Sequence, residues 1–293
     1  MVSKPRVQAR RRNDLPPQGE DSSASLLMEH FFDLLGSGNG QMWVNRILNE
    51  NQDKVVRDLA STPSFEHYFK LVSTWGDVGR AVVAPDPAYV GMGTVHFTHP
   101  FKVFFEEHFA PRLRHRADGF RVIFEHLSAF RDPLIIETGC LRIPDNWEGD
   151  GQSTFQFDCY ARSNGGAVIS IDIGQSSIES ARRACSSKTS LILNDSVAAL
   201  HMLSGLGGKK ASLVYLDSSD LDVNNPLPSA THHILELVAV RPLLAPGTIV
   251  CVDDYALDGF EPGGKGQMID MFMNSIYAEV LYSGYQKIWK MPF

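Results

Sequence analysis

Residues 133–173 constrain the fold of this chain most strongly, because they read as a strand, a glycine-bearing loop, a helix and a second strand. A short apolar run at 134–136 ends on Glu137-Thr138-Gly139, and a polar loop with two further glycines follows. A helix-length segment comes next, and a second apolar run at 167–171 ends on Asp172. Such a unit predicts two parallel strands whose carboxyl ends lie at one ligand-binding edge.

The chemistry of this unit suits a nucleoside. Glycines let a ligand approach the backbone closely, and the N–H groups at a helix N-terminus favour anionic groups. A carboxylate such as Asp172, at the end of the second strand, can accept both hydrogens of a ribose diol. The alternative interpretation is an ordinary turn glycine followed by an acid that caps a helix.

The alternation of strands and helices continues to the C-terminus. Further strands are predicted at 190–193, 212–216 and 248–252, helices at 176–185, 197–206, 230–244 and 266–280, and an antiparallel pair at 280–282 and 286–291. Repeated units of this kind predict an α/β protein with a doubly wound, mostly parallel, seven-stranded sheet and helices on both faces.

The sequence divides into three regions. Residues 1–24 carry a short arginine run, two prolines and polar residues, and we expect a disordered tail. Residues 25–130 show mostly helical spacing and many aromatic side chains, which we expect to cover the site on its substrate side. Residues 131–293 form the sheet domain. Four histidines at 96, 99, 108 and 115 have no i, i+4 partner, so core or surface positions are favoured over a metal site.

Composition excludes several classes of function. The formal net charge of −7 argues against a nucleic-acid-binding surface, and no apolar run is long enough to span a membrane. Four cysteines lie far apart without a CxxC pair, which favours a reducing cytoplasm and disfavours a cysteine-bound metal. We therefore expect a cytoplasmic protein with a small-molecule partner, and the sequence leaves homo-oligomerisation open.

Acidic residues end each of the five central strands. They are Glu137, Asp172, Asp195, Asp217 and the pair Asp253-Asp254. Aspartate is common in turns, but five acids at the edge where such sheets bind ligands indicate a site. Asp195 with Ser196 opens a helix and is positioned to bond an adenine amino group.

Three of these acids, Asp217, Asp253 and Asp254, follow strands that are expected to be neighbours. Converging carboxylates repel one another unless a cation neutralises them, and hard divalent ions such as Mg²⁺ take oxygen ligands. The sequence therefore predicts a magnesium site at this edge. The alternative is that Asp253 or Asp254 merely caps a turn.

From residue 134 to residue 290 the chain resembles class I S-adenosylmethionine-dependent methyltransferases. The ETG, SIDI, NDS, YLDS and VDDY segments occur in the order typical of that family. LLAPGTIVCVDDY, GKGQMIDMF and the closing YSGYQKIWKM resemble the macrocin O-methyltransferase and cephalosporin-hydroxylase-like branch.

The resemblance implies an S-adenosylmethionine site and a bound Mg²⁺. The residues implied around the cofactor are Glu137, Gly139 and Gly151 for the methionine part, Asp172 for the ribose, and Asp195 and Ser196 for the adenine. Thr138, Ser153 and Ile173 are further cofactor-binding candidates. Asp217 is implied as a catalytic residue beside the cofactor and, with Asp253 and Asp254, as a metal ligand.

Two departures from the family pattern stand out. The glycine loop is longer than usual and lacks the compact GxGxG form. Catechol-type relatives carry a catalytic lysine where this chain has Asp220, so the general base is open. His232 and His233 are candidates by residue type, but they fall in a predicted helix, where packing is favoured.

The resulting expectation is an O-methyltransferase that acts on a hydroxyl of a sugar or natural product. Two rivals remain: a nicotinamide-dependent oxidoreductase, and a non-catalytic methyltransferase-like protein that binds or assembles with a partner through its helical N-terminal region. The sequence lacks the GxGxxG fingerprint after the first strand that a nicotinamide-dependent oxidoreductase of this fold is expected to carry.

Overall fold

The computed structural model describes residues 82–83, 100–206 and 208–293. The expected tail at 1–24, most of the helical region before residue 100, and His96 and His99 lie outside the described residues. His108 and His115 are exposed. The domain boundaries read from the sequence remain predictions.

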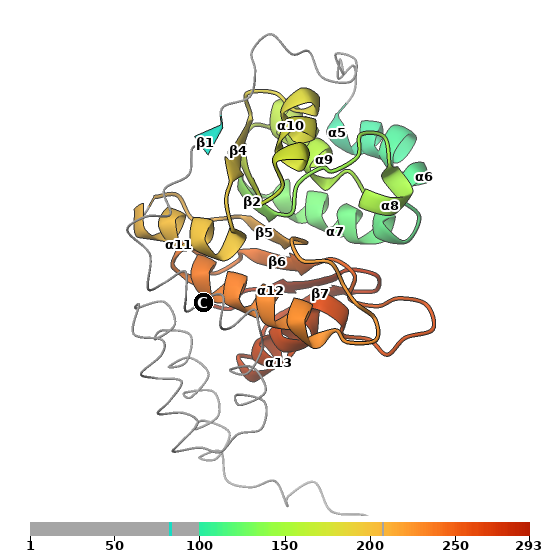
Figure 1. Cartoon of the computed structure of the whole chain (residues 1–293). Helices are drawn as coiled ribbons and strands as arrows, with labels where there is room; N and C mark the ends of the chain where they lie inside the picture. Colours follow the sequence, from blue (N-terminus) through green and yellow to red (C-terminus); the bar gives the residue numbers. More distant parts are fainter. Residues whose placement is uncertain (1–81, 84–99, 207) are drawn as a thin grey trace, which may run out of the picture.

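One sheet of eight strands forms the centre of the molecule (Figure 1), in the order β1-β4-β3-β2-β5-β6-β8-β7. The strands are β1 (Val82–Val83), β2 (Leu134–Thr138), β3 (Ala167–Asp172), β4 (Thr189–Leu193), β5 (Leu213–Leu216), β6 (Ile249–Val252), β7 (Glu279–Ser283) and β8 (Lys287–Lys290). Strands β2 to β6 are parallel to one another, and β8 pairs antiparallel with both β6 and β7. The predicted doubly wound, mostly parallel sheet is confirmed, but it gains an eighth strand because β1 pairs antiparallel with β4.

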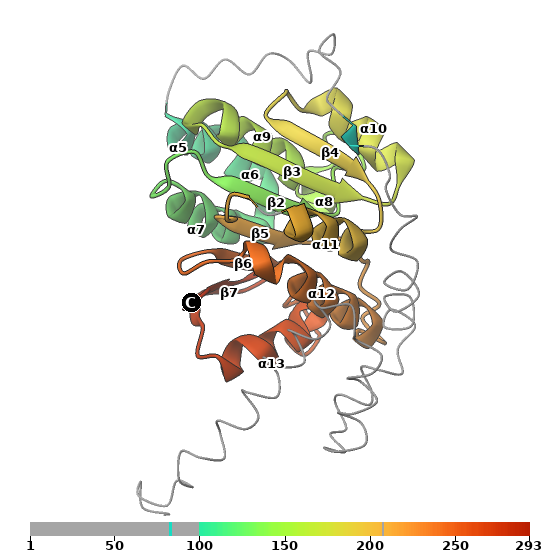
Figure 2. The same ribbon diagram turned by 90° about the vertical axis from the view of Figure 1, so that its left-hand side faces the viewer.

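Helices cover both faces of the sheet (Figures 1 and 2). Before β2 come α5 (Phe101–Phe104), the π-helix η2 (Phe105–Phe109), α6 (Ala110–Leu113), the 3-10 turn η3 (Arg114–Arg116) and α7 (Ala117–Leu127). Between and after the strands lie α8 (Trp147–Asp150), α9 (Ser153–Asn164), α10 (Gln175–Ala184), α11 (Ser196–Leu206), α12 (Leu227–Val240), η4 (Arg241–Leu243), η5 (Gly264–Gly266) and α13 (Gln267–Ser275). None of these helices is long and apolar enough to cross a bilayer.

Alternating side chains of the parallel strands divide the interior into two cores. Ile136 and its neighbours on one face pack with α11, α12 and α13, whereas Ile135 and its neighbours pack with α7, α9 and α10. This division follows from the two-residue period of a strand, which sends successive side chains to opposite faces. The helices at 101–127 belong to the second core, so they are part of the same folded unit as the sheet.

The helix predicted at 266–280 ends earlier than expected, at Ser275. Tyr277 adopts a left-handed conformation with a φ of 55°, and the next N–H, that of Ala278, bonds back to the carbonyl of Met273 at 2.9 Å. A left-handed residue after the last helical turn is a common way for a helix to stop. The chain is thereby released into β7 at residue 279.

Candidate functional site

A hollow of about 200 Å³ lies where the strand order reverses, between β2 and β5. It is formed by residues that follow the carboxyl ends of β2, β3 and β5: Gly139, Cys140, Leu141, Arg142, Asp172, Ile173, Gly174, Asp217, Ser218 and Asp220, together with Asp150, Ser153 and Ser177 from neighbouring helices. Open α/β sheets bind ligands at this reversal point, because the connections on either side leave in opposite directions.

Gly139 brings the ends of β2 and β5 into contact. Its φ is +79°, and a Cβ built there would lie 2.4 Å from the carbonyl oxygen of Asp217. Its N–H donates to the carbonyl of Ile171 at 2.8 Å, and the Asp217 N–H donates to Thr138 at 3.0 Å. Only glycine fits this position, so the glycine of the ETG segment is required by the floor of the hollow.

Asp172 is held rigidly at the rim by the backbone. Its Oδ2 accepts the N–H of Cys140 at 2.9 Å, and its Oδ1 accepts the N–H of Gly174 at 2.6 Å. Each carboxylate oxygen can accept further hydrogen bonds. The following side chain, Ile173, is apolar and 67% exposed, which offers a flat apolar surface beside a fixed carboxylate.

Glu137 is buried directly below the hollow. Burial raises the pKa of its carboxyl to about 7, although hydrogen bonds from Ser153, Ser170 and Thr154 work in the opposite direction. The Leu141 N–H donates to Thr154 Oγ1 at 2.9 Å, so the loop after β2 is tied to the same group of residues. Glu137 therefore supports the loop from beneath and does not line the hollow.

Glu137 gives the protein a characteristic dependence of stability on pH. Because its pKa is raised from 4.5 to about 7 in the folded state, its stabilising effect is complete below pH 4.5 and is lost as the pH rises to about 7. Between about pH 5 and pH 7.5 the loss is expected to be about 2 kcal/mol. We expect the free energy of unfolding of Glu137→Gln, measured in urea across this range, to lack that fall. If the free energy of unfolding of the two proteins changed with pH in the same way, Glu137 would not be the group with the raised pKa.

The three acids predicted to bind a metal do converge. Oxygens of Asp217, Asp253 and Asp254 lie within 4.8 Å of one another. The ammonium group of Lys265 lies among them, paired with Oδ1 of Asp217 and with Oδ2 of Asp254, the latter at 3.0 Å. Burial opposes the positive charge, but the nearby carboxylates raise the pKa of Lys265 well above its ordinary value.

Arg116 is a second buried cation at this cluster. Its Nε donates to Oδ2 of Asp253 at 2.9 Å, and its Nη2 lies 3.6 Å from Oδ1 of Asp254. Its guanidinium also lies over the ring of Tyr285, 4.6 Å from the centroid, while the Tyr285 hydroxyl donates to Asp254 Oδ1 at 2.5 Å. Two cations and one hydroxyl thus bond oxygens of all three acids, whereas Oδ1 of Asp253 is buried without a hydrogen-bond partner.

The acid cluster does not fit a magnesium ion as it stands. A divalent ion coordinated by Asp217 and Asp254 would have to displace the ammonium group that now bonds both of them. Mg²⁺ also demands close, octahedral oxygen ligands, and Oδ2 of Asp253 is already paired with Arg116. The converging acids were predicted correctly, but their neutralising cations in this structure are Lys265 and Arg116.

The other predicted cofactor residues fall into three groups. Ser153, Asp172, Ile173, Gly139 and Asp217 line the hollow, whereas Glu137 and Thr138 are buried beneath it. Gly151 is also buried and faces Arg116, since a Cβ there would lie 2.8 Å from the Arg116 Cδ. Asp195 and Ser196 are outside the lining. Asp195 Oδ1 accepts the Ala198 N–H at 3.0 Å and so caps α11.

His232 and His233, the candidate bases, are packed in α12. Ser196 Oγ and Nε2 of His232 lie 2.9 Å apart, and that nitrogen lies 3.4 Å from Oε1 of the buried Glu236. Although burial alone would raise it, the charges of the two histidines bring the pKa of Glu236 to about 2. His233 is fully buried. Neither histidine lines the hollow. His232 links α12 to Ser196 at the start of α11, and Nδ1 of His233 lies 2.7 Å from the carbonyl oxygen of Ser229 in its own helix.

Several residues of the site were missed by sequence reasoning. Lys265 lies within the GKGQMIDMF segment, where a lysine between glycines soon after paired acids was a usable signal. Arg116 is 137 positions from its partner Asp253, and nothing in the sequence connects the two. Arg142 bridges Asp150 and Asp220 at the rim, at 3.1 and 2.9 Å, so the acid at the catechol-type lysine position is paired with an arginine.

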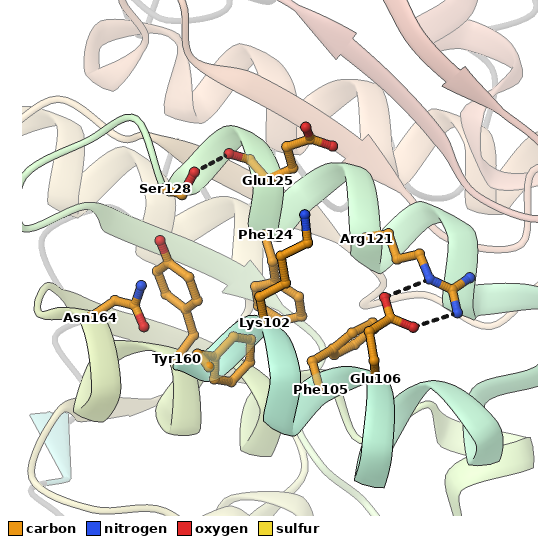
Figure 3. Close-up of a pocket in the computed structure, with 10 residues that line it drawn as sticks. Lys102, Phe105, Glu106, Arg121, Phe124, Glu125, Ser128, Tyr160 and Asn164 are labelled. Carbon is orange, nitrogen blue, oxygen red and sulfur yellow. Dashed lines mark hydrogen bonds and ion pairs between the residues drawn. The ribbon is translucent and has the colours of Figure 1, made fainter. Parts of the chain in front are cut away.

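A second hollow, of about 270 Å³, lies between α5, α7 and α9 (Figure 3). Its lining consists of Phe101, Lys102, Phe105, Glu106, Arg121, Phe124, Glu125, Ser128, Tyr160 and Asn164. Glu106 and Arg121 form a two-bond pair at 2.8 and 2.9 Å on its rim. This hollow holds none of the strand-end acids, so the hollow at the reversal point is the candidate functional site.

No protein-family model and no curated protein sequence matches the chain. Among solved structures, MycE methyltransferase of the mycinamycin biosynthetic pathway, in complex with Mg, SAH and mycinamycin VI, shows 12% identity and a TM-score of 0.46. The match covers 66% of this chain and 54% of MycE, so the chain spans about half the length of that protein. Apo CalS11, a TDP-rhamnose 3'-O-methyltransferase, shows 13% identity and a TM-score of 0.40 over 64% of this chain and 85% of its own.

A third solved structure is a SAM-dependent methyltransferase from Geobacter sulfurreducens in complex with S-adenosyl-L-homocysteine. It shows 14% identity and a TM-score of 0.34, with 56% of this chain and 65% of that chain covered. Structural neighbours of this chain are thus SAM-dependent methyltransferases, and its own strand order and strand-end residues carry the functional argument. The chain has a Rossmann-like, doubly wound fold with a hollow at its reversal point.

Proposed function

We propose that this protein is an S-adenosylmethionine-dependent methyltransferase that acts on a hydroxyl group of a small molecule. The observation that carries the proposal is the hollow at the reversal point, where the fixed carboxylate of Asp172 is followed by the exposed Ile173. A carboxylate at this position suits the two hydroxyls of a ribose, and an exposed apolar side chain next to it suits the plane of an adenine.

The other lining residues suit the rest of the same cofactor. Gly139 exposes backbone at the floor, and Ser153 contributes a hydroxyl from the start of α9. Asp217 is one-fifth exposed and lines the same hollow, so its carboxylate is accessible to a bound ligand. S-adenosylmethionine supplies a sulfonium whose methyl group is the electrophile.

Asp217 is the proposed catalytic residue. In the transfer, the acceptor oxygen forms a bond to the methyl carbon, the carbon–sulfur bond breaks with its electron pair remaining on sulfur, and the hydroxyl proton passes to the Asp217 carboxylate. Lys265 fixes that carboxylate by pairing with its Oδ1. The two residues would thereby orient the acceptor and receive its proton without a metal ion. The sugar or natural-product class of acceptor follows from the sequence resemblance.

Calorimetric titration of the purified protein tests the proposal. We expect S-adenosylmethionine and S-adenosylhomocysteine to bind with micromolar affinity in a buffer that contains EDTA, and NAD⁺ not to bind. Binding of NAD⁺ alone would favour the oxidoreductase. Binding of S-adenosylmethionine without turnover across a broad panel of hydroxyl acceptors would favour a non-catalytic binding protein. An absence of cofactor binding would contradict the proposed function.

A further inference from the structure

We propose that Lys265 permanently occupies a latent divalent-metal site, so that the protein uses an internal ammonium group where its three converging acids would otherwise bind a metal ion. The inference concerns the ion cluster alone and does not depend on methyl transfer. It also predicts that a substitution which removes the ammonium group turns the cluster into a metal site.

The position of the ammonium group is the first argument. It bonds an oxygen of Asp217 and an oxygen of Asp254, which follow two neighbouring strands, β5 and β6. A metal ion shared by these carboxylates would use the same space. The Lys265 side chain is 2% exposed, so the group is enclosed by protein and is not a surface cation resting on an acidic patch.

The backbone that delivers Lys265 is the second argument. Gly264 has a φ of +43°, and a Cβ there would lie 2.0 Å from the carbonyl oxygen of Asp254. The N–H of Gly263 donates to the carbonyl of Tyr255 at 2.8 Å. The turn before Lys265 is therefore pressed against the backbone that follows β6. The backbone itself therefore holds Lys265 beside the acids that follow β6.

The balance of charge is the third argument. When all three are ionised, Asp217, Asp253 and Asp254 contribute three negative charges, and Lys265 and Arg116 supply two positive ones at hydrogen-bond distance. The hydroxyl of Tyr285 donates to the remaining oxygen of Asp254. A divalent ion added to this arrangement would face two buried cations at close range. Without Lys265, two negative charges of the same carboxylates would be uncompensated. The carboxylates would then attract a divalent ion.

A measurement of Mn²⁺ binding tells whether the acid cluster holds an internal ammonium group or a metal ion, and it needs no measurement of activity. The probe is Mn²⁺, titrated into the EDTA-treated protein and followed by the electron paramagnetic resonance signal of the free ion. We expect wild type to bind no Mn²⁺ up to about 1 mM, and Lys265→Ala to gain a site at least roughly tenfold tighter than any binding by wild type. Lys265→Arg, which keeps the charge, should bind as wild type does. Adding Asp217→Asn to Lys265→Ala should abolish the gained site.

Two results would overturn the inference. One is a submillimolar Mn²⁺ site in wild type that is lost in Asp217→Asn or Asp254→Asn, because Lys265 would then be displaced by the metal. The other is a folded Lys265→Ala protein, verified by circular dichroism, that gains no site. If Lys265→Ala does not fold, the wild-type titration still decides between an internal cation and a metal. Failure of S-adenosylmethionine to bind would leave these outcomes unchanged.

Discussion

Asp172→Ala is expected to weaken the binding of S-adenosylmethionine by about 100-fold or more. A carboxylate that accepts both hydroxyls of a ribose makes two charge-assisted hydrogen bonds, each worth about 1.5–3 kcal/mol. The backbone N–H groups of Cys140 and Gly174 already fix the carboxylate in the structure, so it loses little entropy when a ligand binds. Calorimetric titration with S-adenosylhomocysteine measures the loss.

The control for this prediction is Glu125→Ala. Glu125 is an exposed carboxylate on α7, in the lining of the second hollow, and its replacement should leave cofactor affinity unchanged. Asp172→Asn should not restore binding, because its amide hydrogens would face either the N–H of Cys140 or that of Gly174. If Asp172→Ala binds within about threefold of wild type while Glu125→Ala is also unaffected, Asp172 does not hold a ribose.

Arg116→Met is expected to lower the free energy of unfolding by about 3–5 kcal/mol, because it leaves Asp253 buried without its cation. Asp253 is 1% exposed, so water cannot replace the lost hydrogen bond. Methionine keeps much of the volume of the arginine stem, which limits the effect of lost packing. Urea unfolding at neutral pH measures the change.

A double-mutant cycle separates charge from packing. Asp253→Asn in the Arg116→Met background removes the buried charge and should recover a large part of the lost stability, with a coupling energy of about 1.5 kcal/mol or more. Arg121→Met is the matched control, since Arg121 pairs with Glu106 at the surface and its removal should cost about 1 kcal/mol or less. Equal losses for Arg116→Met and Arg121→Met would show that the buried pair is not a stabilising contact.

Patterns local to one element predicted most of the sheet. Each parallel strand is a short apolar run that ends on an acid, and the rule that parallel strands present their carboxyl ends at one edge brings Asp172 and Asp217 to the hollow. Strand β1 was not predicted from the sequence, because it is two residues long and pairs with β4 across more than a hundred positions. The early end of α13 was not predicted either, because a tyrosine in the left-handed conformation leaves no signal in the sequence.

The ion cluster shows where such reasoning stops. Periodicity and topology indicated that three carboxylates would meet and that a cation was needed. They did not identify the cation, because most lysines and arginines of a sequence are solvated and only the three-dimensional structure shows which two lie at the cluster. The adenine assignments of Asp195 and Ser196 remain predictions; the capping bond of Asp195 and the contact of Ser196 with His232 are local packing roles.

Arg116 lies just before α7 and pairs with Asp253 after the end of β6. This contact has a consequence for engineering. One way to try to change substrate preference is to replace the segment before the sheet with that of another protein. In this chain such a chimera would also remove the counter-charge of Asp253, so a graft without an arginine in register with 116 should lose about 3–5 kcal/mol of stability, whatever its fit to a substrate. Any such chimera therefore has to keep Arg116 and Asp253 together as a pair, although the two residues lie far apart in the sequence.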